Sequence, residues 1–176
     1  MAVTAVMLFL LAGVGPATAQ EERGWTLAAT VSALHIDDAL ADELDDRWDP
    51  AVGVRLDYQT DPKVALGAAL WWADAERALW AAGVGLSLAP WGGRPLPLQP
   101  KIFFGVDFLS VDDDLDRGPA IVFGVGVEKR FGRWTVQPSV RNRFLTVDEE
   151  SIDGVSTGRD ASLWEITIAL GHAFKR

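Results

Sequence analysis

The residue types that carry most enzyme chemistry are scarce in this chain. The only histidines are His35 and His172, and the absence of cysteine excludes disulfides and thiolate sites. His35 lies near Ser32 and the Asp37-Asp38 pair, which are the types that form a nucleophile, a base and an orienting carboxylate. In an extended strand, however, Ser32 and His35 point to opposite faces, because side chains alternate along it. The sequence therefore predicts neither a catalytic triad nor an enzyme.

Two acidic runs, at residues 37–46 and 112–116, invite a calcium interpretation because hard cations prefer several carboxylate ligands. Neither run has the glycine and glutamate positions of an EF-hand loop. We therefore expect solvated loops, with no metal and no cofactor. The formal net charge of -9 also argues against a nucleic-acid partner, whose phosphates would be repelled.

Nine other charged residues lie in segments where apolar and polar side chains alternate, and they share the polar face of those segments. In the hairpin at residues 120–144, Ile121, Phe123 and Val125 lie opposite Glu128 and the arginines. Across the chain this polar face carries five cations and four anions: Arg55, Asp57, Lys101, Asp107, Glu128, Arg130, Arg141, Arg143 and Glu165. An enclosed interior needs such near-neutrality, because a buried ion costs several kcal/mol unless it is paired. The balance predicts an ion-pair network inside a barrel, with Glu128 pairing with Arg141 or Arg143.

The elements that must position these charges are strands, because period-2 alternation runs through nearly all of the chain after residue 20. We predict eight strands, at residues 24–36, 51–60, 64–73, 78–89, 98–109, the two arms of the hairpin at 120–144, and 162–174. They are about 10 to 13 residues long, whereas strands of soluble proteins are usually about 5 to 6 residues. A tilted strand that crosses a membrane needs about 9 to 11.

The connections alternate in length. Long acidic loops are predicted at residues 37–49, 111–118 and 148–160, whereas residues 60–63 and 131–133 form tight turns. This alternation predicts an all-β, eight-stranded antiparallel up-and-down barrel with its long loops at one end. Within the seventh strand, Pro138 lacks an amide donor, which predicts a bulge or a break in pairing.

Two features indicate that the apolar face points outward, into a membrane. Glycine recurs on the polar face, where small residues beside long ones let a narrow interior fill. Aromatic residues of the apolar face lie near strand ends, which is typical of two membrane-water interfaces. These predicted interface aromatics are Trp25, Tyr58, Trp72, Trp80, Phe108, Trp134, Phe144, Trp164 and Phe174.

The first residues of the chain form a separate segment. An apolar run at residues 5–14, a Gly-Pro and the small residues Ala17-Thr18-Ala19 predict a secretory signal peptide at residues 1–19. The barrel domain would then be residues 20–176.

These features together resemble the small eight-stranded outer-membrane β-barrel proteins of Gram-negative bacteria, a family described as the outer membrane protein beta-barrel domain. The closing segment TIALGHAF carries the motif, with Thr167 as its polar start and Phe174 as its terminal aromatic. It departs from the family at Ala169, where glycine is usual, and at His172, where an aromatic is usual. Lys175-Arg176 also extend past the terminal aromatic.

The resemblance implies a transmembrane β-barrel in the cell outer membrane, reached after secretion to the periplasm. It implies termini in the periplasm and acidic loops outside the cell. The implied partners are outer-membrane lipid, lipopolysaccharide and, during insertion, the barrel-assembly machinery that reads the terminal aromatic. Weak bridging of the acidic runs to lipopolysaccharide phosphates by divalent cations is an alternative to free solvation.

The function expected from these observations is non-catalytic, with a structural or surface-interaction role through the acidic loops. One alternative is a narrow pore or transporter of small molecules, porin-like in kind. Another is a soluble periplasmic lipocalin-like barrel that binds a ligand with its apolar face inside, and a third is an enzyme that modifies lipid A. The sequence names no external ligand.

Overall fold

The computed structural model describes residues 24–36, 48–74, 78–94, 96–111, 118–149 and 157–175. The predicted signal peptide and the acidic runs at 37–46 and 112–116 lie outside these ranges, so the calcium hypothesis falls on residues that the structure does not describe. No helix in the described ranges is long and apolar enough to cross a membrane.

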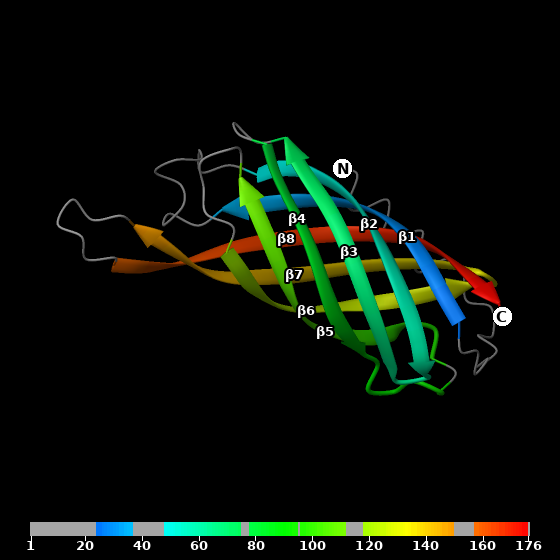
Figure 1. Cartoon of the computed structure of the whole chain (residues 1–176). Coiled ribbons are helices and arrows are strands. Elements are labelled where there is room, and N and C mark those ends of the chain that lie inside the picture. Colours follow the sequence, from blue (N-terminus) through cyan, green and yellow to red (C-terminus); the bar gives the residue numbers. More distant parts are fainter. Residues whose placement is uncertain are drawn as a thin grey trace.

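Eight antiparallel strands form a closed barrel (Figure 1), as the sequence predicts. Each strand pairs with the next, and the first pairs with the last, with Gly24 opposite Lys175. The strands are β1 (Gly24–Ile36), β2 (Trp48–Asp61), β3 (Val64–Asp74), β4 (Ala78–Leu88), β5 (Gln99–Val111), β6 (Gly118–Phe131), β7 (Trp134–Glu149) and β8 (Thr157–Lys175).

The predicted strand ends are least accurate where the long loops were expected. β2 begins at Trp48, and β7 and β8 remain paired as far as Glu149 opposite Thr157. The predicted loop at residues 148–160 is therefore wrong in extent, since β7 and β8 reach past the other strands (Figure 1). Continued pairing satisfies backbone hydrogen-bonding groups, and the β-branched Thr146 and Val147 favour an extended chain.

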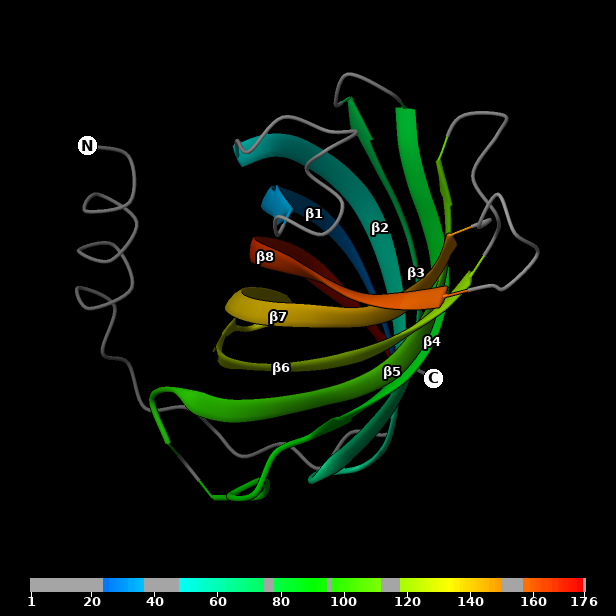
Figure 2. The same ribbon diagram turned by 90° about the vertical axis from the view of Figure 1, so that its left-hand side faces the viewer.

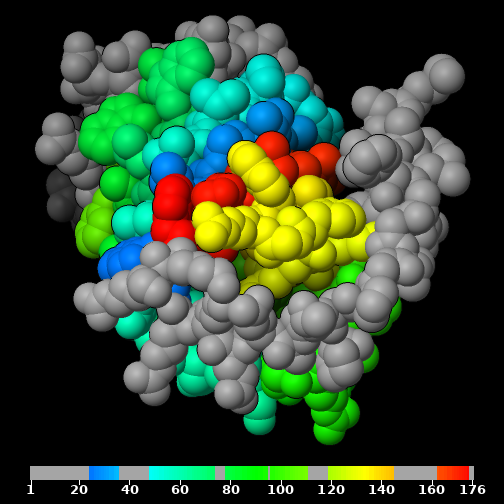
Figure 3. All heavy atoms as spheres, turned by 90° about the vertical axis from the view of Figure 1, so that its right-hand side faces the viewer, coloured from blue at the N-terminus to red at the C-terminus, as the bar shows by residue number. Residues whose placement is uncertain are grey.

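The connections β2–β3, β4–β5 and β6–β7 lie at one end of the barrel, which contains the two tight turns and which we call the short-turn end; the opposite end is the loop end. In the turn between β2 and β3, the amide of Lys63 donates to Asp61 Oδ1 at 2.7 Å. Gly132 has a φ of 63° in the turn between β6 and β7, where a side chain would be strained. Figure 3 views the short-turn end, where the amide of Ala173 donates to the carbonyl of Arg133 at 2.7 Å.

The predicted irregularity at Pro138 is confirmed as a break in pairing. The β6–β7 ladder runs to Gly126 opposite Ser139 and resumes at Lys129 opposite Val136, in the same register, so there is no bulge. Pro138 keeps its pairing with Ile168 on β8. The proline nitrogen carries no hydrogen and cannot donate, and only the ladder on the β6 side is interrupted.

The two faces of the sheet are inverted relative to a soluble barrel. The alternating apolar side chains point outward, and Val31, Val84 and Ile121 are each more than 60% exposed. The charged face lines the interior, which Figure 2 views from the loop end. The lipocalin-like alternative is therefore wrong, because it requires the apolar face to surround an internal ligand.

Candidate functional site

The lumen of the barrel is the candidate site, because it holds the predicted charges. The nine charged residues come from β2, β5, β6, β7 and β8 and face one another across the barrel. Eight of them form ion pairs, which fall into two groups by position, one near the middle of the barrel and one near the short-turn end.

The first group is centred on Arg143, which is 1% exposed. Arg143 Nε donates to Asp107 Oδ2 at 2.6 Å, and its Nη1 lies 2.9 Å from Glu165 Oε2. The second contact is an ion pair without hydrogen-bond geometry, since neither of its atoms has a hydrogen-bond partner. One buried guanidinium thus pairs with carboxylates from two strands, β5 and β8.

Neighbouring side chains fix this group in place. The Arg143 guanidinium lies 4.6 Å from the centroid of the Trp71 ring, and Trp71 Nε1 donates to Asp107 Oδ2 at 3.4 Å. On the other side, Ser32 Oγ donates to Glu165 Oε1 at 2.6 Å and lies 2.9 Å from Thr167 Oγ1. Side chains from five strands therefore meet here, which stabilises the closure between β1 and β8.

The second group lies toward the short-turn end. Glu128 accepts from Arg130 Nε at 2.6 Å and lies 3.5 Å from Lys101 Nζ. The predicted pairing of Glu128 with Arg141 or Arg143 is therefore wrong. Glu128 belongs to the part of β6 nearest the turn, whereas Arg141 and Arg143 pair with Gly124 and Val122, closer to the loop end.

Arg55 completes the second group. Its Nε donates to Asp57 Oδ2 at 2.7 Å, and its Nη2 donates to Gln137 Oε1 at the same distance. The Asp57 partner comes from the same strand two residues on, so this pair is local. The Gln137 bond instead crosses the lumen from β2 to β7.

Arg141 differs from the other lumen cations because none of the described carboxylates lies in ion-pair distance of it. Its guanidinium stacks on Phe103, 4.8 Å from the ring centroid, and Arg55 approaches the same ring at 5.9 Å. Both arginines border a cavity of about 60 Å³. No pattern in the sequence distinguishes Arg141 from Arg143.

The loop-end half of the lumen holds a cluster of apolar side chains, which the sequence analysis missed, and the buried Asp49 lies beside it, opposite Leu34. The members of the cluster are Leu34, Ala51, Trp71, Ala73, Leu79, Ala81, Leu109, Ala120 and Leu163. We call this cluster the apolar plug. The available signal was the position of Leu34, Leu79 and Leu163, which fall in phase with the polar face of their strands. Since Leu34 and Leu163 are each 1% exposed, the plug leaves no open channel there among the described residues.

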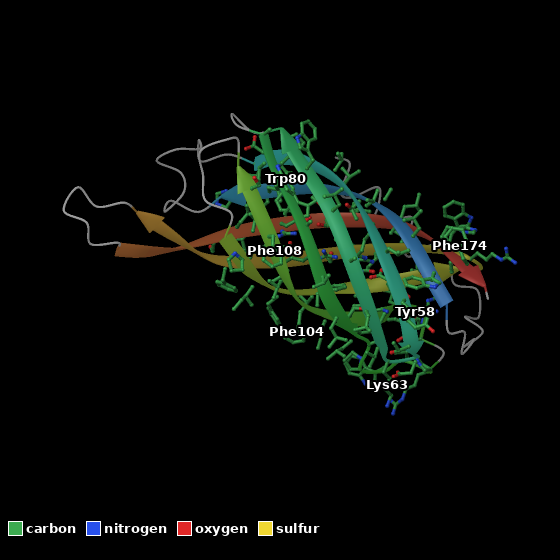
Figure 4. The ribbon with its side chains drawn as sticks, viewed as in Figure 1. Tyr58, Lys63, Trp80, Phe104, Phe108 and Phe174 are labelled. Carbon is green, nitrogen blue, oxygen red and sulfur yellow. The ribbon has the colours of Figure 1, made fainter. Side chains whose placement is uncertain are left out.

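The aromatic residues predicted at the interfaces point outward, and all except the partly buried Tyr58 are well exposed. Toward the short-turn end, Trp25 packs on Tyr58 at 4.8 Å between ring centroids, and His172 lies between Trp134 and Phe174 at 4.9 Å from each. Figure 4 shows Trp80 and Phe108 nearer the loop end and Tyr58 and Phe174 at the other.

Aromatic residues are not confined to the two ends. Phe104 and Phe123 form a pair in the middle of the outer surface, with ring centroids 5.3 Å apart. Phenylalanine lacks the polar atom by which tryptophan and tyrosine favour an interface. The central position of this pair is therefore compatible with an apolar surrounding, and Phe104 is labelled there in Figure 4.

The residues considered for catalysis do not come together. Ser32 points into the lumen toward Glu165, whereas His35 stacks on Trp48 outside, with ring centroids 5.1 Å apart. His172 lies on the outer surface, where its ring packs against Trp134 and Phe174. Within the described ranges, no three of His, Asp and Glu are grouped in a way that suits a metal ion.

Known proteins resemble this chain in structure rather than in sequence. No protein-family model and no curated protein matches it. Neisserial surface protein A is similar at a TM-score of 0.66 and 11% identity, covering 88% of this chain and 100% of that chain. The N-terminal β-barrel domain of Pseudomonas aeruginosa OprF gives 0.59 at 12% identity, covering 88% and 100%. The outer membrane protein OprG of the same organism gives 0.57 at 13%, covering 90% and 99%. The chain thus has the fold of small eight-stranded outer-membrane barrels.

Proposed function

We propose that this protein is an integral outer-membrane β-barrel that crosses the bilayer with its strands. The observation that carries the proposal is the inverted barrel, with an apolar outer surface around a charged, paired interior. A soluble protein rarely exposes a contiguous apolar patch above a few hundred Å². In a bilayer the same surface is in its preferred solvent, and a closed barrel leaves no unpaired strand edge.

The strand lengths and the aromatic residues support the same proposal. The shortest strands, β3 and β4, have 11 residues, and a tilted strand needs about 9 to 11 to span the hydrocarbon. Trp at both ends of the outer surface, with Tyr58 at the short-turn end, suits the two interfaces with water. In this orientation the short-turn end faces the periplasm and the loop end faces outward.

The role we propose for the barrel is non-catalytic: a structural element whose loops contact the cell's surroundings. The acidic composition of residues 37–46 and 112–116 supports contacts with cationic partners, or with lipopolysaccharide phosphates through divalent cations. The apolar plug argues against the alternative of an open pore, because it fills the loop-end half of the lumen. The separation of Ser32 from His35 argues against a lipid A-modifying enzyme.

Membrane fractionation followed by gel mobility of heated and unheated samples tests insertion. We expect the chain in the outer-membrane fraction, released only by detergent, with faster migration when the sample is not heated. Recovery in the periplasmic fraction without detergent contradicts the proposal.

Trypsin added to intact cells tests the orientation. We expect cleavage at Arg47 or Arg117, which lie between β1 and β2 and between β5 and β6, and protection of Lys63 in its tight turn. Lys63 should become cleavable once the outer membrane is permeabilised. Cleavage at Lys63 in intact cells would reverse the proposed orientation.

A further inference from the structure

We propose that the cavity between Arg55 and Arg141 binds a small monovalent anion, either a halide or a short carboxylate. The site lies in the middle of the lumen and depends on the packing inside the barrel. It does not depend on lipid, so it stands apart from the proposal of membrane insertion.

The cavity has a defined wall. Its volume is about 60 Å³, and glycines of β3, β4 and β5 (Gly67, Gly83 and Gly105) form one side of it. Phe103 also borders the cavity, and the guanidinium groups of Arg55 and Arg141 both lie over its ring. One water needs roughly 10 to 15 Å³ of such space, so the cavity holds roughly four to six water-sized groups. This volume suits a small ion with a few waters and excludes a sugar or a nucleotide.

Several hydrogen-bond donors beside this cavity have no acceptor among the described residues. Arg141 Nε and Nη2 and Arg55 Nη1 are buried nitrogen atoms without a hydrogen-bond partner among the described residues. Gln137, which accepts from Arg55 but does not line this cavity, has an unpartnered Nε2 as well. A buried N–H without an acceptor costs about 1–3 kcal/mol, and more when the group is charged. Every one of these atoms is a donor, so the missing partner is an acceptor.

The ion pairs of the lumen point to the same ligand. Each of the four carboxylates among the nine predicted charges already has a cation within ion-pair distance. Arg143 already serves both Asp107 and Glu165, and Glu128 lies between Lys101 and Arg130. With Arg55 paired to Asp57, Arg141 is the one cation of the nine without a carboxylate in ion-pair distance among the described residues. One monovalent anion neutralises it, and a guanidinium binds a planar carboxylate with two parallel hydrogen bonds.

The charge also limits what binds. Asp57 and Asp107 border the same cavity, so a divalent or larger anion would meet two carboxylates. A second cavity of about 20 Å³ lies next to the first toward the short-turn end and shares Arg55, Asp57 and Ser87 with it. We infer that the anion enters from the short-turn end, because the apolar plug fills the other.

Bromide and formate are the probes that test the site, on the folded barrel in detergent and halide-free buffer. In crystals soaked with bromide, we expect an anomalous density peak between the guanidinium groups of Arg55 and Arg141. Formate should raise the midpoint of thermal unfolding in a saturable way and should lower the bromide occupancy in competition. If the cavity in bromide-soaked crystals contains water and no bromide, the proposal is overturned.

Arg141→Gln removes the guanidinium that lacks an ion-pair partner and keeps a polar side chain. We expect it to abolish the bromide peak and the saturable shift of the midpoint. Arg133→Gln, at an exposed arginine of the β6–β7 turn, is the matched control and should keep both. Equal responses of the two variants would show that anions act on the whole surface, which contradicts the site. The wild-type bromide and formate experiments decide the question even if Arg141→Gln does not fold.

Discussion

The carboxylate of Asp107 lies against Gly83, its cross-strand neighbour on β4, so closely that a Cβ atom at position 83 would overlap Oδ1. The same relationship recurs between Asp57 and Gly67, where the added Cβ would lie 2.5 Å from Oδ1. Each carboxylate thus occupies the space that a side chain on the next strand would fill. The glycines of the inner wall therefore determine where the charges can lie.

Gly83→Ala should destabilise the barrel by displacing Asp107 from Arg143. We expect the free energy of unfolding to fall by about 1–3 kcal/mol, the usual cost of inserting an extra carbon into a packed interior. Urea unfolding of the folded barrel, followed by tryptophan fluorescence, measures it. Val84→Ile adds one carbon on the adjacent, outward-facing residue, which is 63% exposed, and should change stability by less than about 0.5 kcal/mol. Equal losses in the two variants would contradict the close-contact explanation.

Arg143→Met should be among the most damaging substitutions in the lumen. It leaves the carboxylates of Asp107 and Glu165 buried without their shared cation, which costs about 3–5 kcal/mol. The same unfolding measurement compares it with Arg130→Met, whose side chain is 45% exposed and whose partner Glu128 keeps Lys101. We expect a loss of about 1 kcal/mol or less for this control.

Neutralising the two carboxylates should rescue the damage to the first group. Asp107→Asn and Glu165→Gln, combined with Arg143→Met, remove the uncompensated charges and should recover much of the lost stability. A triple variant as unstable as Arg143→Met alone would show that packing, rather than charge, explains the loss.

Leu163→Ala should create a cavity in the apolar plug. The side chain is 1% exposed, so we expect a loss of about 2–5 kcal/mol in the free energy of unfolding. Leu170→Ala, on the outer face of the same strand and 51% exposed, is the control and should cost less.

The plug also predicts that the wild-type barrel does not conduct. Recordings in planar bilayers should show no steady ionic current. The apolar plug fills the lumen near the loop end, and the ion pairs of Arg143 fill it near the middle. A steady current through the wild-type protein would contradict closure by the plug.

Val125→Arg tests the outer surface against lipid. Val125 lies in the middle of β6 and is 52% exposed, so the substitution places a charge near the bilayer midplane and should cost about 2–4 kcal/mol. Val64→Arg, at the start of β3 near the short-turn end, should cost about 0–1 kcal/mol. Folding into lipid vesicles at increasing urea concentration measures both. Equal costs at the two depths would argue against a bilayer around the barrel.

The amino-acid sequence determined which side chains share a face and how many strands there are. Alternation is local: residues two apart point the same way, so Arg141 and Arg143 can be assigned to one face without knowing their partners. The break at Pro138 is local too, because the missing donor belongs to the residue itself. The outer limits of β7 and β8 were misjudged, since pairing between two strands can continue into a polar segment.

The tertiary structure alone decided which inner side chains meet. Ser32 and Glu165 are separated by 133 positions and come together only when β1 pairs with β8, and no local pattern encodes that register. A shift along the ladder would exchange one charge partner for another of the same type, which is why Glu128 was assigned to the wrong arginines. The apolar plug has the same origin, because Leu34 and Leu163 form one cluster only once barrel closure fixes the height of every strand.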